Sequence, residues 1–439
     1  MNDCTNNRPN MNRKAFLKVA GQGAAAVAAL SAGAPAVLAG GSPNENVNLG
    51  HIGIGVRGGT LLKQVAGTPA RKGIPGTKVV AVCDVYKPHL EKAVAHSFNP
   101  SVRAYENYED LLADEGVDAV VVAVPDHWHS KILIDACKAG KDVYIEKGWT
   151  RTIAEAKAMR KAVKDSGIVM QLGHQGRQSA AVIQARQLIA GGALGPVTLV
   201  RTGRLMNREA SRPIWRWYGW YDNYDRPDPK KVVENLNWPK WLGPVSDRPF
   251  KMEHFWHWRC YWDYGTGVAG DLLSHEMDFV QAVMGHGIPD SCVCSGQITL
   301  LDDGREVPDT WNTIYEWKEG NGHPPHACTF ATTMNTASPP QYPEFRGKDA
   351  YLVCNGIAQD VNAATGEMSV GEPFMQFDPA KTPEQPSHME DFINSVRERK
   401  QPKCNVDEAF VEAATLIMSV EAWKQQRTAK WDEEKEEIV

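Results

Sequence analysis

The chain has 439 residues, of which 42% are hydrophobic and 23% charged, and its formal net charge is −5. These fractions exclude a disordered or fibrous protein, and the mild charge gives no electrostatic case for a nucleic-acid partner or for an anionic membrane. The length exceeds one ordinary core, so we expect two folded domains behind an N-terminal leader. The nine cysteines are scattered and supply no set of ligands, so we expect buried thiols and no metal site.

Residues 1–42 are predicted to be an export signal. Residues 12–18 read N-R-K-A-F-L-K, and an alanine-rich apolar run follows at residues 24–38. A basic region, an apolar region and small residues near a cleavage site are the layout of a signal peptide. The basic motif resembles a twin-arginine signal in which Lys14 replaces the second arginine. We expect a periplasmic or otherwise exported protein, without a membrane segment after the leader; an alanine-rich disordered leader is the alternative.

Residues 47–172 carry the pattern of a dinucleotide-binding domain. Buried β-branched runs alternate with amphipathic segments, which predicts a parallel sheet covered by helices on both faces. The expected strands after the first one are residues 78–83, 118–124, 142–145 and 168–172, and the expected helices are residues 86–96, 108–114, 129–139 and 153–166.

A glycine-rich loop follows the first expected strand. It contains Gly53, Gly55 and Gly58 in the spacing G-x-G-x-x-G, with Val56 and Arg57 between the last two glycines. Such glycines let the backbone approach a pyrophosphate, which then faces the first turn of the next helix. We therefore expect these five residues to bind a dinucleotide, with Arg57 as a candidate phosphate partner.

Asp84 ends the second strand of this unit. A carboxylate there accepts hydrogen bonds from the ribose 2′-hydroxyl and repels a 2′-phosphate, which favours NAD over NADP. A plain strand-end or capping aspartate is the alternative interpretation. Arg57 and Lys87 leave NADP open, because either cation could hold the extra phosphate.

Two further strand ends carry polar side chains. Residues 124–129 read V-P-D-H-W-H, and we expect Pro125 and His129 near the cofactor, with His129 capping a helix. His127 and His129 could be read as metal ligands, but no third ligand can be assigned. Glu146 and Lys147 close the strand at 142–145; such a lysine could hydrogen-bond a hydroxyl or stabilise an alkoxide, or could form an ordinary surface pair.

Asp271 and His275 form another candidate pair. They are four positions apart, so on a helix they share a face. A carboxylate beside an imidazole can serve as the orienting group and the general base. Many helical pairs of this kind are only structural.

Residues 173–427 are predicted to form a second domain. Longer, partly alternating stretches there predict a mainly antiparallel sheet, and residues 212–264 form an aromatic-rich insertion. The charged tail, residues 428–439, is expected to be frayed. The expected strands are residues 197–204, 295–301, 311–317, 327–334 and 350–354, and the expected helices are residues 180–189, 386–399 and 407–427.

Together these motifs resemble the glucose–fructose oxidoreductase / inositol dehydrogenase / MocA family, over residues 48–427. The resemblance implies an α/β fold: a Rossmann domain followed by an α/β domain with a large open antiparallel sheet. It implies that Lys147, Asp271 and His275 are catalytic, with the histidine as proton acceptor and the other two holding the sugar, and that Glu146 belongs to the cofactor site. The family's proline after the lysine is Gly148 here.

The resemblance also implies a carbohydrate substrate and a homo-oligomer, either a dimer or a tetramer. Aromatic faces suit stacking against sugar C–H groups, so we expect rings of the insertion near the substrate. The residues expected to contact the substrate are His174, Arg177, Arg259, Trp262 and Tyr264.

An exported enzyme meets little free NAD, so its cofactor would travel bound and return to its starting state in each turnover. Two reactions do this: oxidation of one sugar with reduction of another, and cleavage of a glycoside by oxidation, elimination, addition of water and reduction. The second needs no pair of acid–base carboxylates. An ordinary NAD(P)-dependent sugar or cyclitol dehydrogenase is the main alternative, and a non-catalytic carbohydrate-binding protein is a weaker one.

Overall fold

The computed structural model of the chain describes residues 46–206, 228–320, 322–334, 336–337, 343–355, 365–370, 372–376, 382 and 384–439. The predicted leader and the first part of the aromatic insertion, through residue 227, lie outside the described residues. Within the described ranges, no helix combines the length and apolar character needed to cross a membrane.

The first domain is built on a parallel sheet of six strands, in the order β5-β4-β1-β6-β7-β8. The strands are β1 (Val47–Ile52), β4 (Thr77–Cys83), β5 (Arg103–Tyr105), β6 (Ala119–Val122), β7 (Asp142–Glu146) and β8 (Met170–Gly173). The order reverses between β1 and β6, where α/β sheets open a crevice for ligands. The predicted Rossmann domain is confirmed.

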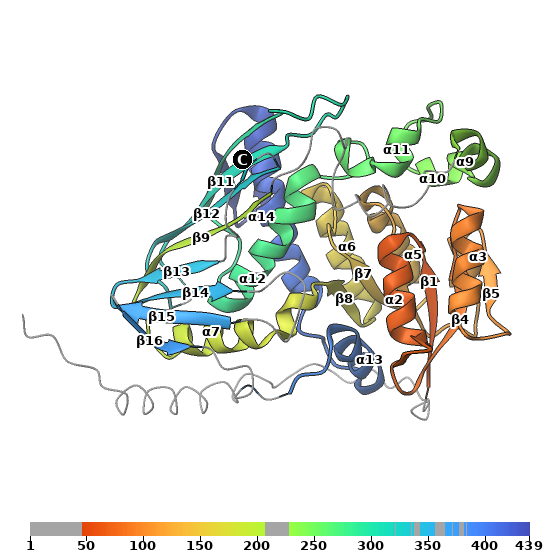
Figure 1. Ribbon diagram of the computed structural model, residues 1–439, viewed down its shortest axis with the longest axis horizontal. Helices are drawn as coiled ribbons and strands as arrows, with labels where there is room; N and C mark the ends of the chain where they lie inside the picture. Colours follow the sequence, from red (N-terminus) through yellow and green to blue (C-terminus); the bar gives the residue numbers. More distant parts are fainter. Residues whose placement is uncertain are drawn as a thin grey trace, which may run out of the picture.

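Helices cover both faces of this sheet (Figure 1). They are α2 (Val56–Ala66), α3 (Lys87–His96), α4 (Tyr108–Leu112), α5 (His129–Lys138) and α6 (Ile153–Ser166). The ends of α6 show why the sequence predicts them well: the Thr152 hydroxyl accepts from the Glu155 amide at 3.1 Å, and Gly167 ends the helix with a φ of 67°. A small hairpin, β2 (Gly67–Thr68) and β3 (Arg71–Lys72), fills the long connection between α2 and β4.

The second domain is built on a ten-stranded sheet in the order β16-β15-β14-β13-β9-β12-β11-β10-β17-β18. Neighbouring strands are antiparallel except β9 and β12, which run parallel. The strands are β9 (Val197–Leu205), β10 (Ser291–Gln297), β11 (Thr310–Trp317), β12 (His326–Thr333), β13 (Glu344–Gly347), β14 (Tyr351–Asn355), β15 (Thr365–Val370), β16 (Glu372–Gln376), β17 (Ala429–Asp432) and β18 (Glu437–Ile438). The predicted, mainly antiparallel sheet is confirmed.

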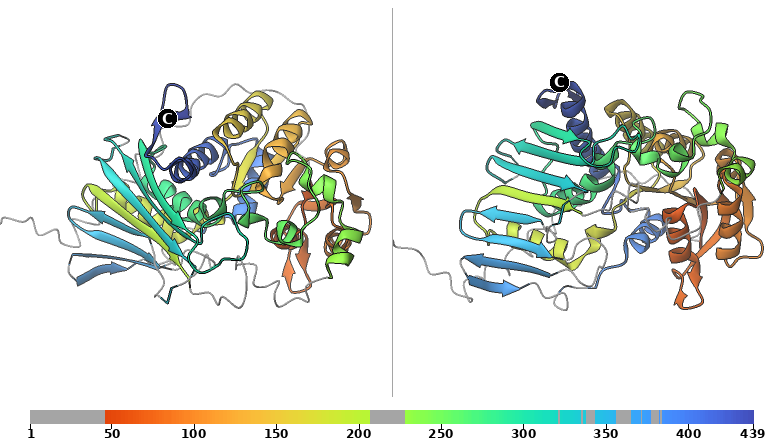
Figure 2. Two further views of the ribbon diagram at one scale, coloured as in Figure 1. Left: turned by 90° about the horizontal axis from the view of Figure 1, so that it is seen from above. Right: turned by 45° about the horizontal axis from the view of Figure 1, so that its top comes forward.

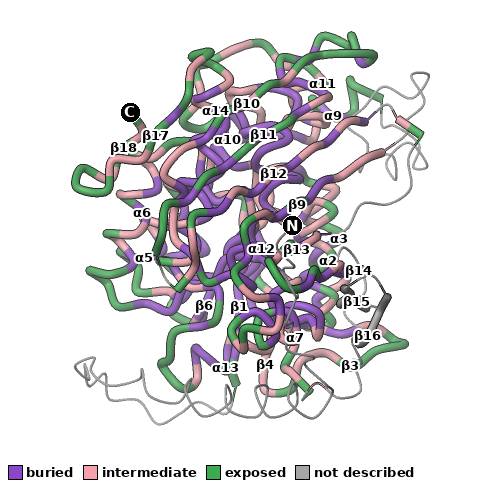
Figure 3. Tube along the Cα trace, turned by 90° about the vertical axis from the view of Figure 1, so that its left-hand side faces the viewer, coloured by how far each residue is buried: buried purple, intermediate pink, exposed green. Residues whose placement is uncertain are grey.

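One face of the large sheet is covered by α7 (Ala180–Ala190), α12 (Ser274–Met284) and α14 (Val406–Gln425), while the other face is open (Figures 1 and 2). Buried and more exposed residues therefore alternate along β11 and β12 (Figure 3). Two C-terminal helices bind the domains together. Helix α13 (His388–Glu398) packs Phe392 into the core of the first domain, and α14 contributes Phe410 to that domain and Leu416 to the second.

The described part of the insertion reaches back over the first domain. It contains α9 (Pro229–Asn235), α10 (Trp238–Leu242) and α11 (Met252–Trp256), which Figure 1 shows above α3 and α5. The amide of Asn237 donates to the carbonyl of Val85 at 3.0 Å, so the contact joins backbone to backbone. The insertion thus covers the carboxyl ends of the strands where a dinucleotide is expected.

Two predictions were wrong. The expected strand at 295–301 lies earlier, as β10, because the carboxylate of Asp309 accepts from the amides of Thr299, Leu300 and Leu301 and folds them into a turn. The tail is not frayed. It forms the hairpin β17–β18 at the sheet edge, with Ala429 buried and Arg160 paired with Glu436.

Candidate active site

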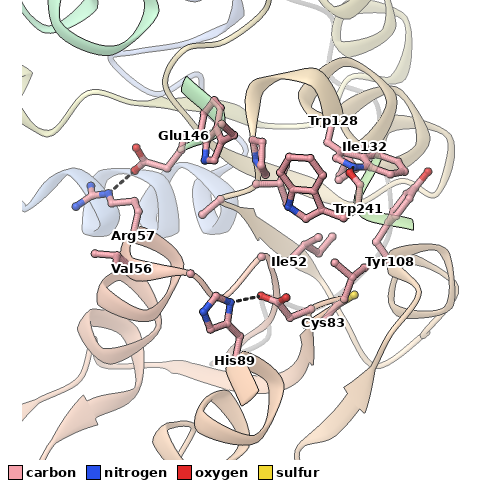
Figure 4. Close-up of a pocket in the computed structure, with 18 of the residues that line it drawn as sticks. Ile52, Val56, Arg57, Cys83, His89, Tyr108, Trp128, Ile132, Glu146 and Trp241 are labelled. Carbon is pink, nitrogen blue, oxygen red and sulfur yellow. Dashed lines mark hydrogen bonds and ion pairs between the residues drawn. The ribbon is translucent and has the colours of Figure 1, made fainter. Parts of the chain in front are cut away.

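A cavity of about 580 Å³ lies at the carboxyl ends of β1, β4, β6 and β7, between the first domain and the insertion. Figure 4 shows part of its lining. Eleven residues predicted for the site line it: Gly53, Gly55, Val56, Arg57, Asp84, Pro125, Glu146, Lys147, Arg259, Asp271 and His275. The sequence therefore brings most of the expected cofactor and catalytic residues to one place.

The glycine loop has the shape of a cradle for a dinucleotide. Gly53 has a φ of 82°, and a Cβ there would lie 2.6 Å from the carbonyl oxygen of Ala123. A Cβ on Gly58 would lie 1.9 Å from the carbonyl oxygen of Gly53, so this glycine sets the close packing of helix on strand and does not line the cavity. A Cβ on Gly55 would meet nothing within 4 Å, which leaves the cavity side of the loop open for a pyrophosphate.

The ribose end of the cavity is acidic. Asp84 accepts from the amides of Ile54, at 2.7 Å, and Tyr86, at 2.8 Å, so it also ties the glycine loop to the end of β4. A carboxylate can accept about four hydrogen bonds, so a ribose hydroxyl can still be bound. Glu106 lines the same end but is paired with Lys240 at 2.7 Å, so Asp84 is the carboxylate there that favours NAD over the extra phosphate of NADP.

Arg57 and Glu146 form an ion pair across the middle of the cavity. The Arg57 Nε atom donates to the Glu146 carboxylate at 2.8 Å, as Figure 4 shows. Burial would raise the pKa of Glu146, but the charge of Arg57 outweighs it and lowers that pKa. Gln175, which sequence reasoning missed, also donates to Glu146, at 3.2 Å. This network joins the start of α2 to the ends of β7 and β8 around the expected pyrophosphate and nicotinamide path.

Lys147 and Asp271, two of the predicted catalytic residues, form an ion pair on the opposite wall. The Lys147 ammonium contacts the Asp271 carboxylate and donates to the Asp271 carbonyl at 3.1 Å. The Arg259 guanidinium also donates to that carboxylate, at 3.0 Å. Asp271 lies in a π-helical turn, Ala269–Leu273, immediately before α12. Such turns are frequent at functional sites; this one lets the buried carboxylate hold a lysine from the other domain.

His275 lies on the first turn of α12 and lines the cavity beside Lys147. Within the described ranges, its ring nitrogens make no hydrogen bond with another residue. Burial, followed by the nearby charges of Lys147 and Arg204, lowers the pKa of His275 well below its usual value. The imidazole is therefore neutral and has a nitrogen ready to accept a proton.

Gly148 and His129 shape the turn that carries Lys147. His129 does not line the cavity; it begins α5, and its ring lies 2.8 Å from the carbonyl oxygen of Gly148 and 3.0 Å from that of Val124. A Cβ on Gly148 would lie 3.1 Å from an oxygen of Asp126, which is tight. The small residue therefore suits a crowded turn, and His129 ties the ends of β6 and β7 together.

His174 and Arg177 lie behind the cavity wall and do not line it. His174 is 1% exposed, and its Nε2 atom is 2.7 Å from the Glu412 carboxylate while its Nδ1 atom is 4.0 Å from that of Asp278. Arg177 pairs with Asp278 and, at 2.8 Å, with Glu408. Their carboxylate partners occupy both side chains, so we withdraw the expected substrate contacts.

This cluster contains a set of donor atoms that could bind a metal ion. It consists of one atom each from His174, Asp278 and Glu412, and these atoms lie within 4.8 Å of one another. The charges favour a proton instead. Arg177 already neutralises Asp278, so one positive charge on His174 balances Glu412, whereas a divalent ion would leave an excess of buried charge. Burial would lower the pKa of His174, but Asp278 and Glu412 raise it above its ordinary value.

Rings of the described part of the insertion line the cavity, but Trp262 and Tyr264, the two that were expected near the substrate, do not. Tyr264 is fully buried, and its hydroxyl lies 2.9 Å from His254. Trp262 stacks on Trp423 at 5.4 Å, away from the cavity. The aromatic residues that line the cavity and that the prediction missed are Tyr108, Trp128, Trp241, Phe255, Trp256 and Trp258. A dense aromatic insertion signals that some rings face the site, but the spacing does not say which.

Comparison with known families explains this arrangement. Models of one oxidoreductase family match the chain in three parts: the NAD-binding Rossmann fold at residues 49–174 and the C-terminal α/β domain at residues 179–316 and 248–431. The chain belongs to this Gfo/Idh/MocA oxidoreductase family. Its first domain is thus a NAD-binding domain, in agreement with the open glycine cradle and the acidic ribose end.

Curated relatives match the chain over part of its length. The chain is 34% identical over 122 residues to scyllo-inositol 2-dehydrogenase (NAD(+)) of Bacillus subtilis, covering 28% of this chain and 35% of that protein. It is 32% identical over 180 residues to levoglucosan dehydrogenase of Pseudarthrobacter phenanthrenivorans, covering 39% and 45%. A glycosyl hydrolase family 109 protein of Shewanella baltica is 26% identical over 264 residues, covering 54% and 55%. The chain thus spans about a third to about half of the length of these relatives.

Solved structures extend the likeness to nearly the whole fold. Levoglucosan dehydrogenase in complex with NADH and levoglucosan has a TM-score of 0.66 at 19% identity, covering 88% of this chain and 99% of that one. Aldose-aldose oxidoreductase from Caulobacter crescentus, complexed with glycerol, has a TM-score of 0.64 at 18% identity, covering 88% and 99%. At these identities the likeness shows the fold, so the substrate has to be argued from the site.

Proposed function

We propose that the chain is a NAD-dependent sugar oxidoreductase that keeps its cofactor bound and restores it within each turnover, with a glycoside as the favoured substrate. The observation that carries the proposal is that Lys147, Asp271 and His275 share one cavity with the glycine cradle. A relative named a glycosyl hydrolase and the aromatic lining of the cavity support a glycoside over a free cyclitol.

Each of the three residues has a definite task. His275, neutral and open to the cavity, accepts the proton of the reacting hydroxyl. Lys147 donates a hydrogen bond to the same oxygen and stabilises the negative charge that develops there. Asp271 holds the lysine in place through the contacts described above, and Arg259 orients the same carboxylate by pairing with it.

In the cleavage reaction, a hydroxyl is first oxidised to a ketone, which acidifies the C–H group on the neighbouring carbon. The aglycone then leaves by elimination, water adds in its place, and the ketone is reduced again. Bound NAD would supply the acceptor for the hydride and, once reduced, its donor. The hydroxyl proton taken up by His275 returns to the oxygen when the ketone is reduced, and the proton removed from the neighbouring carbon is replaced when water adds. The hydride also returns to the sugar, so the cycle leaves no net redox change.

A screen of chromogenic glycosides, with and without added NAD, tests this proposal. We expect aglycone release without added NAD, and mass spectrometry of the purified protein should find one nicotinamide dinucleotide for each chain. Protein purified without any bound nicotinamide, together with cleavage that depends on added NAD in stoichiometric amounts, would contradict it.

An ordinary sugar or cyclitol dehydrogenase is the second candidate. Relatives named inositol and levoglucosan dehydrogenases favour it. Steady accumulation of NADH with a free polyol, followed by absorbance, would support this candidate. The same assay would show no net NADH if the cofactor is recycled internally.

Export and self-association complete the proposal. A leader that carries folded protein through the twin-arginine route would let the cofactor leave the cytoplasm already bound, and fractionation of cells that produce the full chain tests the periplasmic location. Val293 and Ile314 are register partners on the open face of the large sheet, 42% and 44% exposed, and they support a homo-oligomer formed through that face. Light scattering on the purified protein measures its mass directly.

A further inference from the structure

The insertion closes one end of the cofactor cavity. Residues 236–243 cross from the second domain and meet the first domain where β4 and β5 end. There the Asn237 amide donates to the Val85 carbonyl at 3.0 Å, and Leu236 forms an isolated bridge with Tyr86. The contact is made partly by backbone atoms, so it does not depend on any one side chain.

Side chains fasten this segment at two more points. The Glu106 carboxylate accepts from Lys240 Nζ and from the side-chain amide of Asn237, both at 2.7 Å. On the other side, the indole N–H of Trp128 donates to the Trp241 carbonyl at 2.8 Å. The Lys240–Glu106 pair is partly exposed and contributes only modestly, whereas the buried contacts of Trp241 hold the segment firmly.

The insertion closes the end of the cavity where the adenosine half of NAD is expected. Asp84, the expected ribose ligand, ends β4, and the cavity continues from it to Tyr108 after β5 and to Trp128 and Ile132 beside α5. Figure 4 shows Tyr108, Trp128, Ile132 and Trp241 gathered on this side, away from the Arg57–Glu146 pair. In a sheet of this order, the adenine of a bound dinucleotide lies beyond the carboxylate that holds its ribose, between the ends of β4 and β5.

We propose that residues 236–243 form a roof over the adenine ring, with Trp241 as the contacting side chain, and that this roof retains NAD. Trp241 is 5% exposed and stacks on Trp238 with ring centroids 4.8 Å apart, so it is held rigidly where it lines the cavity. Gly243 packs against Trp128: a Cβ on Gly243 would lie 2.0 Å from the indole ring of Trp128. NAD can then leave only when several contacts open together.

The inference rests on the proposed function, because a recycled cofactor has to stay bound. The expected position of adenine follows from the NAD-binding domain. Its test compares the two halves of the cofactor. ADP-ribose contains the adenosine half and reduced nicotinamide mononucleotide contains the other half, so a roof over adenine affects the first ligand and not the second.

The main variant is Trp241→Ala, with Trp241→Phe as the variant that restores an aromatic ring. Removing an aromatic contact with a base weakens binding by about 5- to 150-fold. We expect Trp241→Ala to lose ADP-ribose affinity and to release NADH faster by that factor, with reduced nicotinamide mononucleotide bound as before, and Trp241→Phe to recover most of the loss. Calorimetry gives the affinities, and a fluorescence chase of bound NADH with excess NAD gives the release rate.

Lys240→Ala keeps the proposal testable if the tryptophan variant folds poorly. Lys231→Ala is its matched control, because Lys231 is exposed on α9 in the same insertion. We expect Lys240→Ala to release NADH faster than Lys231→Ala. Unchanged ADP-ribose affinity and NADH release in both Trp241→Ala and Lys240→Ala would overturn the roof. Net NADH accumulation by the wild-type enzyme would instead overturn the redox-neutral reaction, and the difference between the two halves of the cofactor would still stand.

Discussion

Two histidines face each other across the wall of the cavity, and their surroundings are opposite. Their ring centroids are 5.6 Å apart at an angle of 89°. His275 opens to the cavity and is kept neutral by burial and by neighbouring cations, whereas His174 is closed off and held beside Glu412 and Asp278, which raise its pKa. Access and pairing, more than residue type, decide which of the two can take a proton from a substrate.

The largest expected effect concerns His275, the histidine that opens to the cavity, and its neighbour Lys147. Replacing His275 with Asn, or Lys147 with Ala, should lower kcat by about 100- to 10,000-fold, because each change removes a group that acts on the reacting oxygen. Neither side chain is needed for the glycine cradle or the adenosine end. Mass spectrometry of the purified variants should therefore find NAD still bound. Near-native turnover in either variant would remove that residue from the reaction.

The next largest effect concerns the buried cluster around His174. Arg177→Met leaves the Asp278 carboxylate buried without its cation, and breaking a buried pair of this kind costs about 3–5 kcal/mol. The midpoint of chemical denaturation should fall accordingly. Glu408→Gln is the matched control, because the Glu408 side chain is 45% exposed and its pair with Arg177 is worth at most about 1 kcal/mol. Equal stability losses in the two variants would contradict a buried, charge-balanced cluster.

The same contrast explains how far the sequence could predict the site. The glycine loop, Asp84, Lys147 and the pair Asp271–His275 were predicted, because local spacing and position at a strand end or on a helix constrain them. His174 and Arg177 also follow a strand end, but their partners Asp278 and Glu412 come from α12 and α14, and only the tertiary fold brings them together.

The fold follows the same division. Strands and helices of the first domain were predicted closely, because continuous β-branched runs and helix caps are local signals. The tail was not, because Ala429 becomes buried only when β17 pairs with β10 at the edge of a distant sheet. The parallel pairing of β9 with β12 likewise depends on the closing of the whole sheet.

A pH profile sharpens the comparison further. Because the folded-state pKa of His275 is lowered, the base stays unprotonated as the pH falls through about 6.5, and the acid limb of kcat should lie below that value. The pKa of His174 is shifted in the opposite direction. Because its folded-state pKa is raised, His174 contributes stability that is present below about pH 6.5 and is lost as the pH rises through the raised value.

Glu412→Gln couples the two histidines. It removes a carboxylate that keeps His174 charged, and that charge is one of the causes that lower the pKa of His275. The acid limb of kcat should therefore move toward higher pH in this variant. Glu408→Gln, whose carboxylate lies at the exposed edge of the cluster, should leave the limb in place. An unchanged limb in Glu412→Gln would show that the two rings titrate independently.

The smallest expected effect separates two tryptophans of the insertion. Trp258 lines the cavity, and the Arg259 guanidinium lies 4.0 Å from its ring, so Trp258→Ala removes both a wall and a support for the arginine that holds Asp271. A cation–π contact is worth about 0.5–1 kcal/mol, so KM for the glycoside should rise by about two- to fivefold. Trp262→Ala should change KM by less than about twofold, because that ring stacks on Trp423 outside the cavity. If Trp262→Ala raises KM more than Trp258→Ala, the substrate approaches from the outer side of the insertion and the cavity wall assigned here is the wrong one.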